Sequence, residues 1–365
     1  MEWIDGIGDL YDNSSSGDYC CDDGGDVCDL KEGKQFEAVF IPVLYSVAFV
    51  VGVLGNGVLL GVLAQSRRTW SVTDTFILHL GVADILLLLT LPLWAAQSAQ
   101  VQGWTFGTPL CKITGAVFTI NFYCGIFLLA CISLDRYLSI VHATQMYSRR
   151  KPWVVHVSCS AVWLFSLLLS IPDWIFLEAV HDERRDKTVC VCNYFKFNSE
   201  TVGDWRLASR LIYHTVGFLL PSAALIFCYS CILCRLHSGS QGLQKQKAFR
   251  IIVAVVMVFF ICWTPYNITL MVDTLTSNNT ITDRCGVQTS LDKAKIVTSS
   301  VGYLHCSLNP ILYAFVGVKF RRQLLDILRS LGCKLKMSPK LQSVGPSRRS
   351  SLWSNSADTS NSIAV

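Results

Sequence analysis

Residues 76–96 read FILHLGVADILLLLTLPLWAA, and Asp84 is the only charged residue in this stretch. Its length matches the ~20 apolar residues with which a helix crosses the hydrocarbon core of a bilayer. The chain holds further blocks of the same kind, which makes seven in all. The seven blocks are Phe40–Ala64, Phe76–Ala96, Leu110–Val141, Trp153–Leu177, Leu207–Cys234, Ile251–Leu275 and Ile296–Val316.

These blocks are expected to be helices, because lipid leaves no backbone polar group unpaired and the residues lack the alternation of barrel strands. The whole chain is 52% hydrophobic and only 16% charged, which is too apolar for an ordinary soluble domain. The sequence therefore predicts an all-α membrane protein, a seven-transmembrane helix bundle without room for a second folded domain.

The distribution of charge predicts the orientation. Residues 1–37 hold eleven acidic residues against Lys31 and Lys34, whereas Arg67, Arg68 and the basic run at 149–151 follow spans one and three. Basic loops stay on the cytoplasmic side, so the N-terminus is expected outside and the C-terminus inside the plasma membrane. No cleavable signal peptide is visible, and the first span is expected to serve as a signal anchor.

The segments around the bundle (residues 38–317) predict three further regions. Residues 1–37 form an acidic extracellular tail, expected to be disordered. Residues 318–333 alternate apolar and basic side chains in the manner of a short amphipathic eighth helix on the membrane surface, and residues 334–365 form a Ser-rich, disordered cytoplasmic tail. Tyr11 and Tyr19 have acidic neighbours typical of sulfated tyrosines, and Asn13 opens a glycosylation sequon. A merely solubilising acidic tail explains the same composition.

Cysteines on the outer side predict two disulfide bridges. Cys111 opens span three, and the loop between spans four and five offers Cys190 and Cys192. Either cysteine of that pair is a possible partner for Cys111, and we favour Cys192. Cys28 in the tail and Cys285 before span seven are the predicted second bridge.

Polar residues inside the spans are costly in lipid and indicate function by default, although some only hold helices together. Asp84 is one, and Asn309 supplies a polar partner at similar depth. At the inner end of span three, Asp135-Arg136-Tyr137 forms a charge pair that a partner protein would break. Trp263 stands just before the kink expected at Pro265.

Together these features resemble the rhodopsin-like G-protein-coupled receptors in every span. The matching positions are Asn56, Asp84, Asp135-Arg136-Tyr137, Trp163, Pro221 with Tyr229, Cys262-Trp263-Thr264-Pro265, and Asn309 to Tyr313. Narrower motifs look like the chemokine receptor family, and most like the C-X-C chemokine receptor type 3 subgroup. They include Thr90-Leu91-Pro92, residues 104–107 before Cys111, His181–Arg184 and Tyr303–Phe320.

The resemblance implies a C-X-C chemokine receptor that activates a heterotrimeric G protein of the inhibitory class, mobilises calcium and drives leukocyte chemotaxis. It implies these ligand-binding residues: Tyr11, Tyr19, Tyr45, Trp94, Phe118, Asp173, Tyr266, Asp273, Lys295, Ser299 and Tyr303. It implies these residues for activation and G-protein coupling: Asp84, Asp135, Arg136, Tyr137, Tyr229, Trp263, Pro265, Asn309, Pro310 and Tyr313. Receptor kinases and arrestin are the further partners it implies, besides membrane lipid; no nucleic acid is expected.

Some positions depart from the family's pattern. Ser299 and Gln97 replace acids that many chemokine receptors carry, so the negative charge of the pocket is expected to depend on Asp173 and Asp273. Gly125, His305 and Cys306 alter the residues that usually complete a sodium site around Asp84, and no sodium is expected there. The seven histidines lack ligand spacing, so we expect no enzyme activity, cofactor or metal. A scavenging receptor that internalises ligand without signalling is the alternative, and the intact Asp135-Arg136-Tyr137 argues against it.

Overall fold

The structure is a computed structural model that describes residues 30–65, 70–141, 152–182, 186–194, 202–237, 243–277 and 284–316. The predicted residues Tyr11, Asn13, Tyr19 and Cys28, together with the predicted helix 318–333 and the C-terminal tail, lie outside the described residues. The side chains of Cys285 and Tyr313 also lie outside them.

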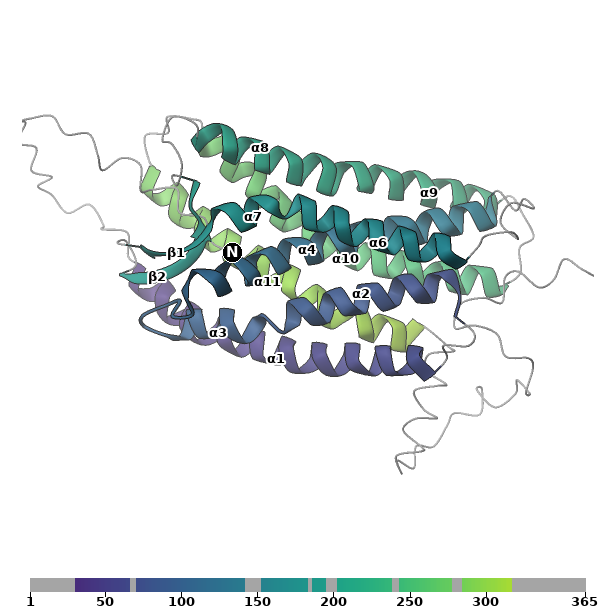
Figure 1. Ribbon diagram of the computed structural model, residues 1–365, viewed down its shortest axis with the longest axis horizontal. Coiled ribbons are helices and arrows are strands. Elements are labelled where there is room, and N and C mark those ends of the chain that lie inside the picture. Colours follow the sequence, from purple (N-terminus) through teal and green to yellow (C-terminus); the bar gives the residue numbers. More distant parts are fainter. Residues whose placement is uncertain are drawn as a thin grey trace, which may run out of the picture.

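The described residues form helices that run side by side along the long axis of the molecule, with a small hairpin at one end (Figure 1). In chain order the elements are α1 (Leu30–Gln65), α2 (Val72–Leu88), α3 (Leu91–Ala99), α4 (Gly107–Ile140), α6 (Pro152–Leu169), α7 (Ile171–Phe176), β1 (Leu177–Asp182), β2 (Lys187–Cys192), α8 (Val202–His214), the π-helical segment η5 (Thr215–Leu219), α9 (Leu220–His237), α10 (Leu243–Ser277) and α11 (Arg284–Val316). Helices α2 and α3, α6 and α7, and α8 to α9 each make one of the predicted spans. The prediction of an all-α seven-helix bundle is confirmed.

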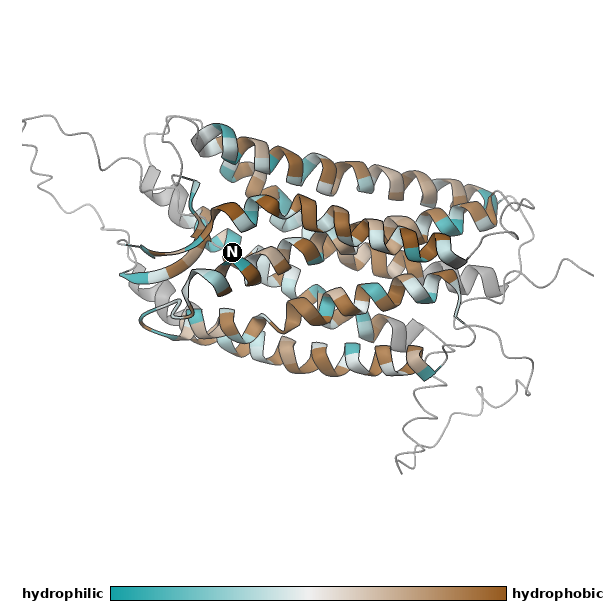
Figure 2. Cartoon of the chain, viewed as in Figure 1, coloured by the Kyte–Doolittle hydropathy of each residue, from teal (hydrophilic) through white to brown (hydrophobic). Residues whose placement is uncertain are grey.

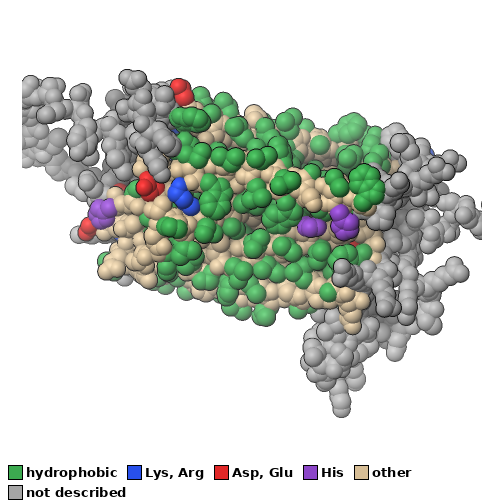
Figure 3. Space-filling model, in the orientation of Figure 1, with side chains coloured by type: hydrophobic (Ala, Val, Ile, Leu, Met, Phe, Trp, Pro, Cys, Tyr) green, Lys and Arg blue, Asp and Glu red, His purple; other side chains and the backbone are tan. Residues whose placement is uncertain are grey.

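Apolar side chains cover the flanks of this bundle, as the hydropathy colouring and the space-filling view both show (Figures 2 and 3). Six stretches of the described helices are long and apolar enough to cross a membrane. They are Ala38–Gln65, Val72–Ala99, Gly107–Ile140, Trp153–Phe176, Gly203–His237 and Ile252–Thr276. The seventh helix, α11, is more polar, because residues such as Ser299, His305 and Asn309 face the bundle interior, where α11 contacts α1, α2 and α10.

Three of the spans are broken where the sequence has a proline. The break between α2 and α3 lies at Leu89–Thr90, two residues before Pro92, and the break between α6 and α7 lies at Ser170, two residues before Pro172. The π-helical segment η5 ends two residues before Pro221. Proline cannot donate an N–H and disfavours the helical conformation of the residue before it, so the backbone adjusts just upstream. Pro265 and Pro310 lie inside continuous helices.

The hairpin β1–β2 is antiparallel, and Cys190 in β2 forms a disulfide with Cys111 at the start of α4. The prediction of a Cys111–Cys192 bridge is therefore wrong. The register gives the reason: Cys190 pairs with Ala179, whose N–H donates to Thr108 in the first turn of α4. The Cα atoms of Cys111 and Cys190 are 5.5 Å apart, within the usual range for a disulfide.

Cys192 lies deeper along the bundle than Cys190. Its partner in the hairpin is Leu177, and a Cβ atom added to Gly115 would lie 2.3 Å from the Leu177 side chain. Cys192 is thus level with Gly115, one helical turn past Cys111, and it is a buried free thiol. Its position, not its orientation, excludes it from the bridge, because residues two apart in a strand point to the same face.

Candidate ligand pocket and buried polar core

A network of buried charges centres on Asp273, near the C-terminal end of α10, at the end of the bundle that carries the hairpin. A carboxylate oxygen of Asp273 accepts a hydrogen bond of 2.7 Å from Arg210 and one of 3.3 Å from Arg206. The amine of Lys295 lies 2.8 Å from the other oxygen and 3.6 Å from Asp292. Arg206 and Arg210 are four residues apart on α8, so both reach the same side of that helix.

Asp273 therefore contributes no unpaired negative charge, in contrast to what the sequence suggested. The side chain is only 1% exposed, and charges buried in a low-dielectric interior require partners of this kind. Arg206 and Arg210 were missed by the sequence analysis. The only available signal was a pair of basic residues four apart at the start of an apolar span.

Asp173 is the second predicted acid of the pocket, and its surroundings differ. It lies in α7, is buried, and is in hydrogen-bonding contact with Thr119 of α4. Among the residues that the structure describes, no cation forms an ion pair with it. It lies near Cys192 and Tyr194, just past β2. Asp173 is thus the carboxylate that a cationic ligand group would find unneutralised.

Cys192 and Tyr194, which lie near Asp173, are both shielded from solvent. Burial raises the pKa of the Cys192 thiol well above its ordinary value, and the nearby charge of Asp173 raises it further. Burial likewise raises the pKa of Tyr194 well above its usual value. Both groups are therefore neutral in the folded protein near pH 7.

A cluster of aromatic rings brings together four predicted ligand-binding residues and Trp263. Phe118 contacts Tyr303, Tyr266 and Trp263, with ring centroids 4.8, 5.6 and 5.3 Å apart. The Tyr45 ring lies 5.2 Å from Tyr303. These rings come from α1, α4, α10 and α11. The cluster therefore couples the packing of these four helices near the hairpin end.

Trp94 and Ser299 are the two other described residues that were predicted for the pocket. Trp94 in α3 packs against Trp104 with the rings tilted and their centroids 5.3 Å apart, and the backbone N–H of Trp104 donates to the Thr188 carbonyl in β2 at 2.7 Å. Trp94 therefore supports the hairpin. Ser299 is buried in α11, and its hydroxyl donates to the carbonyl of Ile296.

A polar core lies in the middle of the bundle around Asp84. Asn121 of α4 donates to one oxygen of Asp84 at 3.1 Å, and Asn309 of α11 donates to the other at 2.6 Å. Asn56 of α1 donates to the backbone carbonyl of Cys306 at 2.9 Å. Helices α2, α4 and α11 thus meet at a buried acid, as the sequence predicted for Asp84 and Asn309, and Asn56 joins α1 to α11.

At the opposite end of the bundle, Arg136 is held inside the structure. Its side chain donates to the hydroxyl of Thr73 in α2, and its Nε atom lies 3.9 Å from a carboxylate oxygen of Asp135. Tyr229 of α9 shares a hydrogen bond of 2.8 Å with Ser133. Tyr137 packs against Phe227, with centroids 5.7 Å apart. Arg136 is only 7% exposed, so its side chain is buried among the described helices.

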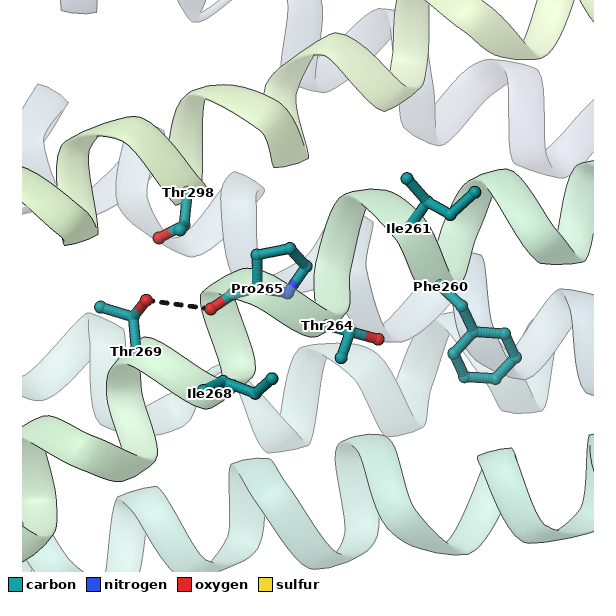
Figure 4. A pocket seen from close by; sticks show the side chains of 7 residues that line it. All are labelled: Phe260, Ile261, Thr264, Pro265, Ile268, Thr269 and Thr298. Atoms are coloured by element: carbon teal, nitrogen blue, oxygen red, sulfur yellow. Dashed lines mark hydrogen bonds between the residues drawn. The ribbon is translucent and has the colours of Figure 1, made fainter.

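One further cavity, of about 610 Å³, opens on the flank of the bundle beside Pro265 (Figure 4). It is lined by Phe260, Ile261, Thr264, Pro265, Ile268, Thr269 and Thr298. The Thr269 hydroxyl donates to the Pro265 carbonyl, one helical turn earlier, at 2.9 Å. No charged residue lines this cavity, and of the predicted functional residues only Pro265 does, so it is distinct from the charged pocket.

Comparison with known proteins agrees with this geometry. Residues 55–313 match the family of seven-transmembrane receptors of the rhodopsin type. The chain is 49% identical over 334 residues to "C-X-C chemokine receptor type 3" of Rattus norvegicus, covering 91% of this chain and 88% of that protein. It is 46% identical over 358 residues to the Homo sapiens protein of the same name, covering 98% and 94%. It is 40% identical over 338 residues to "C-X-C chemokine receptor type 5" of Homo sapiens, covering 92% and 89%.

The chain therefore belongs to the rhodopsin family of seven-transmembrane receptors and, within it, to the C-X-C chemokine receptors. It is a multi-pass membrane protein, and members of this family are receptors and not enzymes. The relatives named type 3 agree with the subgroup that the sequence motifs indicated.

Proposed function

We propose that the protein binds a basic C-X-C chemokine at the hairpin end of the bundle and activates a heterotrimeric G protein of the inhibitory class at the opposite end. In this proposal the hairpin end faces the outside of the plasma membrane and the C-terminus faces the cytoplasm. The acidic tail with Tyr11 and Tyr19 attracts the chemokine by its charge, since opposite charges accelerate association of proteins.

The single observation that supports this proposal best is the unneutralised carboxylate of Asp173 beneath the hairpin, beside the balanced charges around Asp273. A cationic group at the N-terminus of the chemokine would pair with Asp173 directly. It would also compete with Arg210 and Lys295 for Asp273, and the released cations would then have to move. Ligand binding would thereby alter how α8, α10 and α11 pack near the hairpin.

The aromatic cluster offers a physical route from that change to the other end. Tyr266 and Tyr303 belong to α10 and α11, and both contact Phe118. A shift of Trp263 would displace the neighbouring rings, and the polar residues around Asp84 would repack. The release of Arg136 from Asp135 and Thr73 would then open a site for the G protein. Phosphorylation of the Ser-rich tail by receptor kinases and binding of arrestin would follow, with calcium release and chemotaxis as cellular results.

The test is nucleotide exchange on purified components. The full chain in lipid nanodiscs, with an inhibitory-class Gα and its βγ subunits, should release GDP faster when one member of a chemokine panel is added. Arg136→Ala should abolish the acceleration and leave chemokine binding within about threefold of the unmodified chain. Chemokine binding and internalisation without exchange would overturn the proposal and favour a scavenging receptor.

A further inference from the structure

Three side chains of different chemistry converge beside the polar core. A carboxylate oxygen of Asp84, a ring nitrogen of His305 and the sulfur of Cys306 all lie within 4.8 Å of one another. Asp84 belongs to α2, whereas His305 and Cys306 are adjacent residues of α11. Each side chain is at most 1% exposed. An oxygen, a nitrogen and a sulfur ligand thus meet in a site shielded from solvent.

His305 provides a second, independent observation. Neither of its ring nitrogens has a hydrogen-bond partner among the described residues, although the residue lies in the interior. Its ring faces the aromatic ring of Phe259, 5.3 Å away. A buried polar atom without a partner costs about 1–3 kcal/mol, and native structures keep few of them. The imidazole therefore has coordination capacity that the protein itself does not use.

The set of ligands favours a particular class of metal. Zinc takes carboxylate, imidazole and thiolate ligands in tetrahedral geometry, whereas magnesium and calcium prefer oxygen alone. The amide oxygen of Asn121, 3.6 Å from the Cys306 sulfur, is available as a fourth ligand.

Charge balance points the same way. Binding of a divalent ion by a cysteine releases the thiol proton, so Asp84 and Cys306 together would supply two negative charges. A zinc ion with one carboxylate, one thiolate and one neutral imidazole has no net charge, which matters because an uncompensated charge at this depth is costly. Zinc lies about 2.0–2.3 Å from its ligands, so these three atoms would have to approach to about 3.4–3.8 Å of one another.

We propose that Asp84, His305 and Cys306 form a site for a zinc ion that joins α2 to α11. The site does not depend on the proposed ligand or on the G protein. A metal bound there would tie two helices that meet only through side chains at this depth, and it would stabilise the arrangement in which it binds.

The experiment uses the full chain in nanodiscs, after exposed thiols have been capped with a membrane-impermeant alkylating reagent. Equilibrium dialysis against zinc should give one more bound ion per chain than in Asp84→Asn or in Cys306→Ser. Replacement of zinc by cobalt should produce a sulfur-to-cobalt absorption band, which Cys306→Ser should abolish. Cys159→Ser removes a buried thiol of α6 outside the cluster and should change neither result.

Equal metal content in the unmodified chain and both variants, or a cobalt band that survives in Cys306→Ser, would overturn the proposal. If either variant fails to fold, X-ray absorption of zinc in the capped, unmodified chain decides the question. One sulfur at about 2.3 Å with nitrogen and oxygen at about 2.0–2.2 Å is the expected coordination. Coordination by oxygen alone would exclude the site.

Discussion

The amine of Lys295 on α11 lies 2.8 Å from a carboxylate oxygen of Asp273 on α10, and neither side chain is more than 1% exposed. The pair therefore joins two neighbouring helices through a buried charge interaction. Arg210 brings α8 to the same carboxylate. Removing the anion would leave three cations around a site with too little negative charge.

Asp273→Asn should accordingly destabilise the receptor by about 3–5 kcal/mol, the usual cost of breaking a buried ion pair from one side. A thermal-shift or denaturation assay in detergent measures this loss. Lys293→Met is the matched control for the change at Lys295, because Lys293 is an exposed cation of α11, the helix that carries Lys295. The double variant Asp273→Asn/Lys295→Met should lose less than Asp273→Asn alone, since it also removes one of the stranded cations. An equal or larger loss in the double variant would contradict this account.

Loss of the hairpin disulfide should cost about 2–5 kcal/mol. Cys190→Ser and Cys111→Ser should lower the thermal midpoint equally, and the double variant should add nothing. Peptide mass mapping of Cys192→Ser should still find residues 111 and 190 cross-linked. Finding Cys111 joined to Cys192 in the unmodified chain would mean that the hairpin register is different.

Gly217 in η5 leaves no room for a side chain. An added Cβ atom would lie 2.4 Å from the ring of Tyr123, so Gly217→Ala should destabilise the fold by about 1–3 kcal/mol through overpacking. Gly57→Ala is the control, because nothing lies within 4 Å of the corresponding Cβ position in α1. Thermal midpoints of the two variants give the comparison. Equal midpoints would show that Tyr123 moves aside freely.

Because of Cys192, the free energy of unfolding of the protein should decrease at alkaline pH. Burial raises the pKa of this thiol in the folded protein. The stability that comes from burying the neutral thiol is therefore intact below its ordinary pKa of ~8.5, and it is lost as the pH rises from there towards the folded-state pKa. The free energy of unfolding of the unmodified chain should thus fall more steeply above pH 8.5 than that of Cys192→Ser. Parallel curves for the two proteins between pH 7 and pH 10 would show that this thiol is not shielded.

Asp173→Asn should weaken the response to the chemokine. If this carboxylate receives a cationic group of the ligand, its neutralisation should raise the half-maximal ligand concentration for nucleotide exchange at least tenfold, at equal surface expression. Asp186→Asn removes an exposed acid at the hairpin tip, where the side chain is 97% exposed, and should change potency less than twofold. A similar effect of both variants would indicate long-range attraction instead of contact.

The sequence predicted the helices well, because long apolar runs leave little choice in lipid. It predicted Leu110–Val141 where α4 spans Gly107–Ile140. The seventh helix was predicted from Ile296, yet α11 begins at Arg284. Asp292 and Lys295 lie before the predicted start of this span. The helix buries both, and Lys295 lies 2.8 Å from Asp273 and 3.6 Å from Asp292.

The candidate site was predictable only in part, because several of its contacts join distant parts of the chain. Motif positions such as Asp84 and Asn309 meet as expected, since the family resemblance fixes their helices. The hairpin β1–β2, the choice of Cys190 and the approach of Arg206 and Arg210 to Asp273 depend on contacts between distant parts of the chain. Hydropathy and motif spacing contain no information on such contacts.

The π-helical turn at 215–219 carries one residue more than an α-helix needs for the same rise. Deleting a single residue there should let the turn revert to α-helix without displacing the faces that α8 and α9 present to their neighbours. The same deletion elsewhere in this span would rotate everything beyond it by about 100°. Gene duplicates that differ in length within this span are therefore expected to differ at this turn.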